Sequence, residues 1–170
     1  TKIIRTNVSD YFYSLICYNI IMPELPEVET IRRGLTQFIK NVRIKKVTIL
    51  CEKSFVGPKS LVENQEVISI SRRGKALLIG LKNGITMLIH LRMTGQLIYR
   101  GEDTAALNLL SSGQLKDNKV FAGGHPTDSF FTALPNQQTR VIFELENGQL
   151  FFNDQRKFGF VKILETAKLS

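Results

Sequence analysis

Tryptophan is absent from the 170 residues, and cysteine and histidine occur only twice each. Cys17 and Cys51 do not form a CxxC pair, and His90 and His125 have no neighbouring ligand residues, so no metal site is expected. Two widely separated cysteines favour a reducing compartment over a disulfide framework. The apolar run at residues 11–21 is too short to span a bilayer and no cleavage site follows it, so we expect neither a membrane partner nor a signal peptide.

Carboxylates are missing from two long tracts, residues 30–51 and 67–101, and each tract holds six lysines or arginines. The whole chain carries a net charge of +8 and has a pI near 9.7. On net charge alone, a basic soluble protein without a polyanionic partner is an equally good interpretation. The uneven distribution favours a phosphate-binding surface. Neither tract has the pattern of a basic amphipathic helix, which disfavours lipid headgroups.

Residues 26–40 are expected to form a helix, because Val28, Ile31 and Leu35 recur at helical spacing and Pro26 suits the first turn. Aliphatic and β-branched runs follow, separated by hairpin signals such as Asn83–Gly84. The expected strands are residues 42–50, 67–71, 75–81, 85–93, 95–99, 139–145, 149–153 and 158–164, and a short helix is possible at 58–65. This pattern predicts an α+β fold that is mainly β, an antiparallel β-sandwich with one or two flanking helices.

Four stretches carry a family resemblance in the same order along the chain: MPELPEVETIRRGL (22–35), SRRGKALLI (71–79), HLRMTGQL (90–97) and NDQRKFG (153–159). They resemble the amino-terminal, catalytic domain of the formamidopyrimidine-DNA glycosylases, bacterial base-excision repair enzymes. The resemblance implies a DNA glycosylase and AP lyase that removes oxidised purines such as 8-oxoguanine and formamidopyrimidine from damaged double-stranded DNA. It also implies a monomer in the bacterial cytoplasm, associated with the nucleoid.

The resemblance places the catalytic residues at the start of the chain's family match and at one later lysine. Pro23 would be the nucleophile that forms a Schiff base with C1′ of the damaged nucleotide, followed by β,δ-elimination. Glu24 would move protons, Glu27 would support the amine and its water, and Lys75 would contact the phosphate or sugar beside the lesion. Judged from spacing alone, a proline that only shapes the helix entry is the more common arrangement.

The resemblance also implies a set of DNA-contacting residues. Met93, Arg156 and Phe158, called the wedge residues below, would enter the space left by the flipped nucleotide. Without the motif, Phe158 would be assigned to the core. His90 would contact a phosphate, although a structural histidine fits the pattern nearly as well.

Two segments depart from the family pattern. Residues 1–21 have no family counterpart and are expected to be upstream or added sequence, with Met22 as the true start. Residues 22–170 would then form the glycosylase amino-terminal domain, interrupted by a long loop at residues 101–138. The family's helical and zinc-finger domains are absent, so no cofactor is expected in this chain. If residues 1–21 are retained, the Pro23 nitrogen is a tertiary amide and cannot act as the nucleophile.

Three alternatives remain open from the sequence. The first is a catalytically inactive DNA-binding fragment of such an enzyme, and the second is an oxidised-pyrimidine relative of the endonuclease VIII type. The third is a basic β-rich domain that binds RNA through its backbone. An imine trapped at an abasic site would distinguish the enzyme from the two binding modules, and lesion preference at matched salt would separate DNA repair from RNA binding.

Overall fold

The computed structural model describes residues 25–102, 120–125 and 132–169. Its one α-helix in these ranges, α2, spans Leu25–Ile39 and confirms the helix predicted from the apolar spacing. The buried face of α2 is formed by Val28, Ile31, Leu35 and Ile39. Three short 3₁₀ turns lie at Glu52–Ser54, Lys59–Leu61 and Thr166–Leu169.

Ten strands account for most of the remaining described residues, and all but one neighbouring pair run antiparallel. Their bounds are β1 Arg43–Ile49, β2 Phe55–Val56, β3 Gln65–Arg73, β4 Ala76–Leu81, β5 Ile85–His90, β6 Gly95–Gly101, β7 Val120–Gly124, β8 Thr139–Leu145, β9 Gly148–Asp154 and β10 Phe160–Glu165. Hydrogen bonding orders them as β2-β10-β5-β4-β3-β1-β8-β9-β6-β7. The exception is the parallel pair of β2 and β10.

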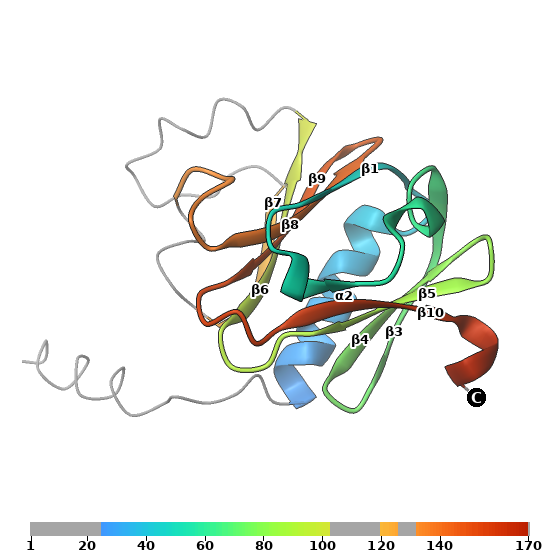
Figure 1. Cartoon of the computed structure of the whole chain (residues 1–170), viewed down its shortest axis with the longest axis horizontal. Coiled ribbons are helices and arrows are strands. Elements are labelled where there is room, and N and C mark those ends of the chain that lie inside the picture. The colour runs from blue at the N-terminus through green and yellow to red at the C-terminus, as the bar shows by residue number, and fades with distance from the viewer. Residues whose placement is uncertain (1–24, 103–119, 126–131, 170) are drawn as a thin grey trace, which may run out of the picture.

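Strand β1 joins the two halves of the sheet, because its start pairs with β3 and most of its length pairs with β8. Helix α2 contacts β3 in one half and β7 at the edge of the other, and Figure 1 shows it between the two halves. The larger of two apolar clusters contains side chains from α2 and from both halves, and the smaller one is formed by Ile98, Ile142 and Phe151. The mainly β, α+β class is therefore confirmed, whereas two separate sheets of a sandwich are not, since the sheet is continuous through β1.

Two departures from the predicted elements bear on the site. Strand β5 ends at His90, three residues earlier than predicted, because Arg92 adopts φ +56° and the Gly95 N–H donates to the Leu91 carbonyl at 2.9 Å, which closes a tight turn. Strand β7 lies inside the segment predicted to be a loop, where Val120–Gly124 pairs with β6. No helix in the described residues is long and apolar enough to cross a membrane.

Candidate functional site

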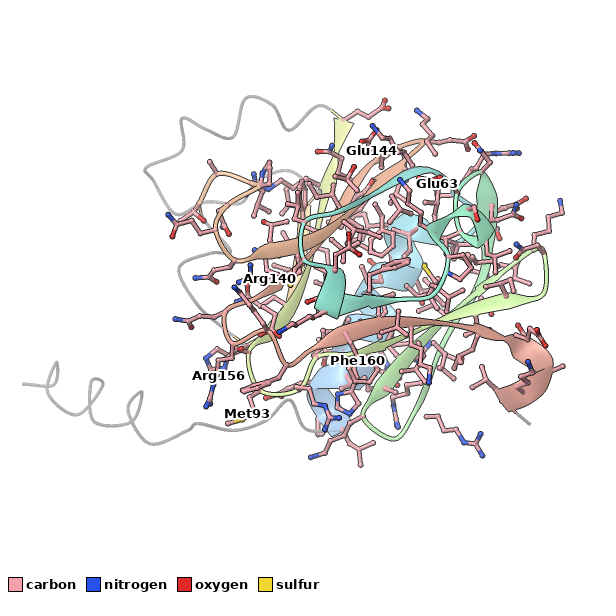
Figure 2. The ribbon with its side chains drawn as sticks, in the orientation of Figure 1. Glu63, Met93, Arg140, Glu144, Arg156 and Phe160 are labelled. Carbon is pink, nitrogen blue, oxygen red and sulfur yellow. The ribbon has the colours of Figure 1, made fainter. Side chains whose placement is uncertain are left out.

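The three wedge residues come together on two adjacent loops, one between β5 and β6 and one between β9 and β10. Arg156 Nη1 lies 3.5 Å from Met93 Sδ, and the Arg156 guanidinium lies 5.6 Å from the centroid of the Phe158 ring. Figure 2 shows Met93 and Arg156 side by side at one end of the molecule. Phe158 is 60% exposed, so it is not a core residue. Exposed apolar and cationic groups of this kind can enter a base stack.

Asp154, the last residue of β9, holds these two loops together. One of its carboxylate oxygens, Oδ1, accepts hydrogen bonds from the Thr94 hydroxyl and from the Arg156 N–H, and Oδ2 accepts one from the Gly159 N–H at 2.6 Å. The Thr94 hydroxyl oxygen also accepts from the Arg156 N–H, at 3.1 Å. Asp154 is 1% exposed, so the carboxylate is satisfied by these donors rather than by water.

Both loops adopt tight conformations that glycine makes possible. A side chain at Gly95 would place its Cβ 2.3 Å from the Leu91 carbonyl oxygen, and one at Gly159 would lie 2.9 Å from the Phe152 ring. Arg92 and Lys157 have φ of +56° and +60°, which is disfavoured for residues with a side chain. The conformation of each loop therefore depends on contacts beyond local preference.

Lys75 and His90 lie beside the wedge loops. Lys75 directly precedes β4, where Ala76 pairs with His90 of β5, and the His90 ring stacks on Phe160 with centroids 5.8 Å apart. His90 Nδ1 accepts a hydrogen bond from the Arg92 N–H at 3.1 Å. Partial burial, together with the charges of Arg92 and Lys75, lowers the pKa of His90. The imidazole is therefore mainly neutral at pH 7 and offers a donor rather than a full charge.

The first turn of α2 is tied to the same end of the sheet by Glu29. Its carboxylate accepts hydrogen bonds from Arg32, Arg33 and Arg72, the last of these from β3 at 2.9 Å. These hydrogen bonds, first of all those from Arg32, hold the pKa of the Glu29 carboxyl well below its usual range. Glu27 lies half a turn earlier on this helix. The bridge to Arg72 places the start of α2 next to the β3–β4 turn that carries Lys75.

Basic side chains of the described surface differ in whether a carboxylate lies beside them. At the end remote from the wedge, Arg43, Lys45 and Lys82 pair with carboxylates of Glu146, Glu102 and Glu66 at 3.3–4.0 Å. Within the described ranges, no carboxylate lies within ion-pair distance of Lys75, Arg92 or Arg156. Cations without an acidic partner beside exposed wedge side chains form a surface suited to a phosphate backbone.

A hollow of about 410 Å³ lies away from these residues. Its lining includes Lys45, Arg100, Glu144 and Phe151, from β1, β6, β8 and β9. Figure 2 shows Glu144 at the opposite end from Met93 and Arg156. In the described part of the chain, no group of three His, Cys, Asp or Glu side chains could hold a metal ion.

The structure thus brings six of the eight predicted site residues to one end of the sheet: Glu27, Lys75, His90, Met93, Arg156 and Phe158. Pro23 and Glu24 lie outside the described residues. The sequence interpretation did not single out Asp154, Thr94 or Glu29, which fix the loops and the helix. Asp154 and Thr94 stand within two of the quoted motifs, but no spacing rule predicts that their side chains meet across 60 residues.

Comparison with known proteins shows which family has this sequence and fold. Residues 22–161 match the model of the formamidopyrimidine-DNA glycosylase N-terminal domain. The formamidopyrimidine-DNA glycosylase of Pelotomaculum thermopropionicum is 36% identical over 154 residues, and that of Agrobacterium fabrum is 33% identical over 159. Each alignment covers 87% of this chain and 45% or 47% of the relative. The chain belongs to the formamidopyrimidine-DNA glycosylase family, and it spans about half the length of these relatives.

Solved structures of a family member show the same fold. The Lactococcus lactis enzyme bound to DNA containing N7-benzyl-Fapy-dG has a TM-score of 0.64 to this chain and 25% sequence identity. Its complex with abasic-site DNA has a TM-score of 0.63. The comparisons cover 86% of this chain and 45% of the Lactococcus protein. The matched part of this chain therefore corresponds to one portion of the Lactococcus lactis protein, which is bound to DNA in both structures.

Proposed function

We propose that this chain provides the catalytic domain of a base-excision DNA glycosylase and AP lyase that removes oxidised purines such as 8-oxoguanine and formamidopyrimidine. The observation that carries the proposal is the assembly of Met93, Arg156 and Phe158 beside Lys75, all near the start of α2. Family membership supports the same reaction. The partner is damaged double-stranded DNA, met by a monomer in the bacterial cytoplasm.

The chemistry starts from Pro23, two residues before α2. Once Pro23 is the first residue, its nitrogen is a secondary amine with a lone pair available near neutral pH. The amine attacks C1′ of the damaged nucleotide, the bond from C1′ to the base breaks, and the base leaves with a proton. Opening of the sugar ring gives an iminium ion, from which β-elimination releases the 3′ phosphate and δ-elimination the 5′ phosphate. Glu24 protonates the ring oxygen, and Glu27 supports the amine.

The wedge residues make the target carbon accessible to that amine. A nucleotide rotated out of the duplex loses a few kcal/mol of stacking and pairing. Met93 and Phe158 fill the vacated space, and Arg156 donates hydrogen bonds to the unpaired partner base. Lys75 and His90 hold the phosphates on either side of the extruded sugar. A neutral His90 donates a hydrogen bond without adding charge, while Lys75 supplies the ion pair.

Borohydride trapping on a duplex with one abasic site tests the nucleophile, because an abasic site needs no base recognition. Residues 1–170 are compared with a version that begins at Pro23, and the matched control is the shorter version with its amine acetylated. We expect a covalent adduct only with the free amine at Pro23. Equal trapping by the acetylated control would show that another amine reacts and would refute the Pro23 assignment.

A second candidate is a DNA-binding part without its own catalysis. The observation in its favour is the sequence preceding Met22, which leaves Pro23 as an amide in the chain as given. This candidate predicts preference for abasic over intact duplex without any trapped adduct, even from the version beginning at Pro23. Equal affinity for both duplexes at matched salt would instead indicate backbone binding alone.

The lesion class requires its own comparison. A complex of the Lactococcus protein contains oxidised-pyrimidine DNA, so that protein binds such DNA. Release of 8-oxoguanine and of an oxidised pyrimidine from otherwise identical duplexes is measured side by side. Faster release of the purine supports the proposal, and faster release of the pyrimidine supports the alternative of an endonuclease VIII type.

A further inference from the structure

The two wedge loops meet through one buried carboxylate rather than through direct contacts of the wedge residues alone. Asp154 accepts from the Thr94 side chain on the β5–β6 loop and from the Arg156 and Gly159 backbone on the β9–β10 loop. Two of the donors, Arg156 and Gly159, lie at the two ends of the segment that carries Phe158. The third, Thr94, directly follows Met93. Loss of the carboxylate would therefore release both loops together.

Asp154 itself is fixed from the opposite side. Its N–H donates to the Gln138 carbonyl at 2.9 Å, and its carbonyl accepts from Arg140 Nε at 2.8 Å. Arg140 is 8% exposed and sits where the register of β8 and β9 shifts, an irregularity that redirects a side chain. Arg140 Nη1 donates to the Gln137 carbonyl as well, at 3.0 Å. The carboxylate is thus anchored to strand β8 and cannot follow the loops if they move.

The loops need such an anchor because their conformations are locally disfavoured. Arg92 and Lys157, one in each loop, have positive φ values that residues with a side chain rarely adopt. Arg156 and Phe158 are also exposed, so little burial holds them in place. Without the hydrogen bonds to Asp154, we expect the β9–β10 loop to sample several arrangements.

We propose that Asp154 is a positioning residue that orders the wedge before DNA is bound. The inference rests on the proposed function, because a wedge has a role only if the chain acts on a flipped nucleotide. Ordering the loops in the free protein removes the entropy loss that would otherwise accompany their insertion. Asp154 does not touch the DNA in this account; it acts through Thr94, Arg156 and Gly159.

Asp154→Asn is the informative variant because it keeps size and removes one acceptor. Its amide group offers a single acceptor oxygen, so its NH₂ must face one of the sites now occupied by a donor. Glu63→Gln is the matched control. Glu63 is a half-buried carboxylate that, like the buried Asp154, accepts a backbone N–H, from Val47 at 3.0 Å, and Figure 2 shows it far from Met93 and Arg156.

The first measurement follows hydrogen exchange of individual amides in the full chain without DNA. In Asp154→Asn we expect at least about tenfold faster exchange at Arg156 or at Gly159, whichever N–H then faces the NH₂ group, because loss of a hydrogen bond to a charged acceptor has an effect of this size. Amides of the core strands β4 and β8 should exchange as in the original protein. Glu63→Gln should leave the amides of both wedge loops unchanged.

The second measurement uses a duplex with a tetrahydrofuran abasic analogue and 2-aminopurine in the neighbouring pair, whose fluorescence rises on unstacking. For Asp154→Asn we expect loss of most of that rise and about a tenfold smaller preference for this duplex over an intact one. The slope of affinity against salt should stay the same, because the phosphate contacts remain. A role limited to fold stability would not separate these two properties.

The outcomes distinguish this inference from the proposed function. Unchanged exchange at Arg156 and Gly159 overturns the role of Asp154, whatever the DNA results. Faster exchange with an unchanged fluorescence rise shows that loop order does not matter for the wedge, and also overturns it. If the original chain itself has no preference for the abasic duplex, the proposed function fails and the wedge role with it, while exchange still reports whether Asp154 orders the loops.

Discussion

Phe158→Ala should separate DNA recognition from stability more clearly than any other change in the wedge. Phe158 is 60% exposed, so at most about 80 Å² of a ring that can bury roughly 200 Å² is removed from water in the free protein. At about 25 cal/mol per Å², this burial contributes no more than about 2 kcal/mol. The matched control is Phe143→Ala on β8, where the ring is 0% exposed within the main core. That change should destabilise the fold by about 3–5 kcal/mol.

The effect on DNA binding should be large for Phe158→Ala and small for the core substitution. A ring inserted into the base stack contributes about 1–3 kcal/mol, so Phe158→Ala should lose most of its preference for a duplex with an abasic analogue. Affinity for intact duplex should change little, since the phosphate contacts do not involve the ring. Phe143→Ala, examined at a temperature where it is folded, should keep the preference.

Urea unfolding measures the loss of stability, and binding to abasic and intact duplexes at matched salt measures the preference for the abasic duplex. Equal destabilisation by the two substitutions would mean that Phe158 packs in the core after all. An unchanged preference in a stable Phe158→Ala protein would remove the ring from the wedge, leaving Met93 and Arg156 to fill the stack.

Three further changes test the surroundings of the wedge. Gly95→Ala should destabilise the protein by about 1–3 kcal/mol in urea unfolding, because its Cβ would lie 2.3 Å from the Leu91 carbonyl oxygen. The control is Gly84→Ala, whose Cβ meets no atom within 4 Å and which adds only the backbone strain of φ +77°. The pKa of Glu29 in the folded protein lies below its unfolded value of about 4.5, so its contribution to stability is present above that pH and is lost as the pH falls. Glu29→Gln should therefore reduce the dependence of stability on pH below about pH 4.5. An unchanged dependence would contradict the stabilising role of the hydrogen bonds from Arg32, Arg33 and Arg72. Lys75→Gln should reduce the slope of log affinity for DNA against log salt concentration by about one. Lys82→Gln, at the other end of β4, should leave that slope unchanged. Equal reductions of the slope by both substitutions would indicate unspecific binding.

Helix α2 and most of the strands could be predicted because their signals are local. The apolar spacing of α2 and the hairpin signal at Asn83–Gly84 predict structure without knowledge of distant residues. Strand β7 gave no such signal, since Val120–Gly124 ends in two glycines and becomes a strand by pairing with the edge of β6. The end of β5 was missed because the aliphatic pattern continues through Met93, while the turn is set by the backbone of Arg92 and Gly95.

The site residues could likewise be predicted only in part: the motifs identify the residues, whereas the contacts between distant residues are seen only in the fold. The motif resemblance identified Met93, Arg156 and Phe158 as one group, but it did not show which contacts hold them together. Their assembly depends on Asp154, whose donors come from positions 94, 156 and 159, and on the shifted register that aims Arg140 at its carbonyl. These contacts join residues up to 60 positions apart, so periodicity and spacing along the chain do not encode them.

Charge gives the strongest reason to connect the wedge with the basic composition. Lys75, Lys82 and Arg92 all belong to the same acid-free tract, and their charge alone does not distinguish them. The fold places Lys82 beside Glu66 but leaves Lys75 and Arg92 next to His90 without a carboxylate partner in the described residues. Cations that repel one another destabilise a compact protein unless a polyanion neutralises them. Since these cations border the wedge residues, a phosphate backbone bound there would neutralise them and bring the base stack to Met93 and Phe158 in a single docking geometry.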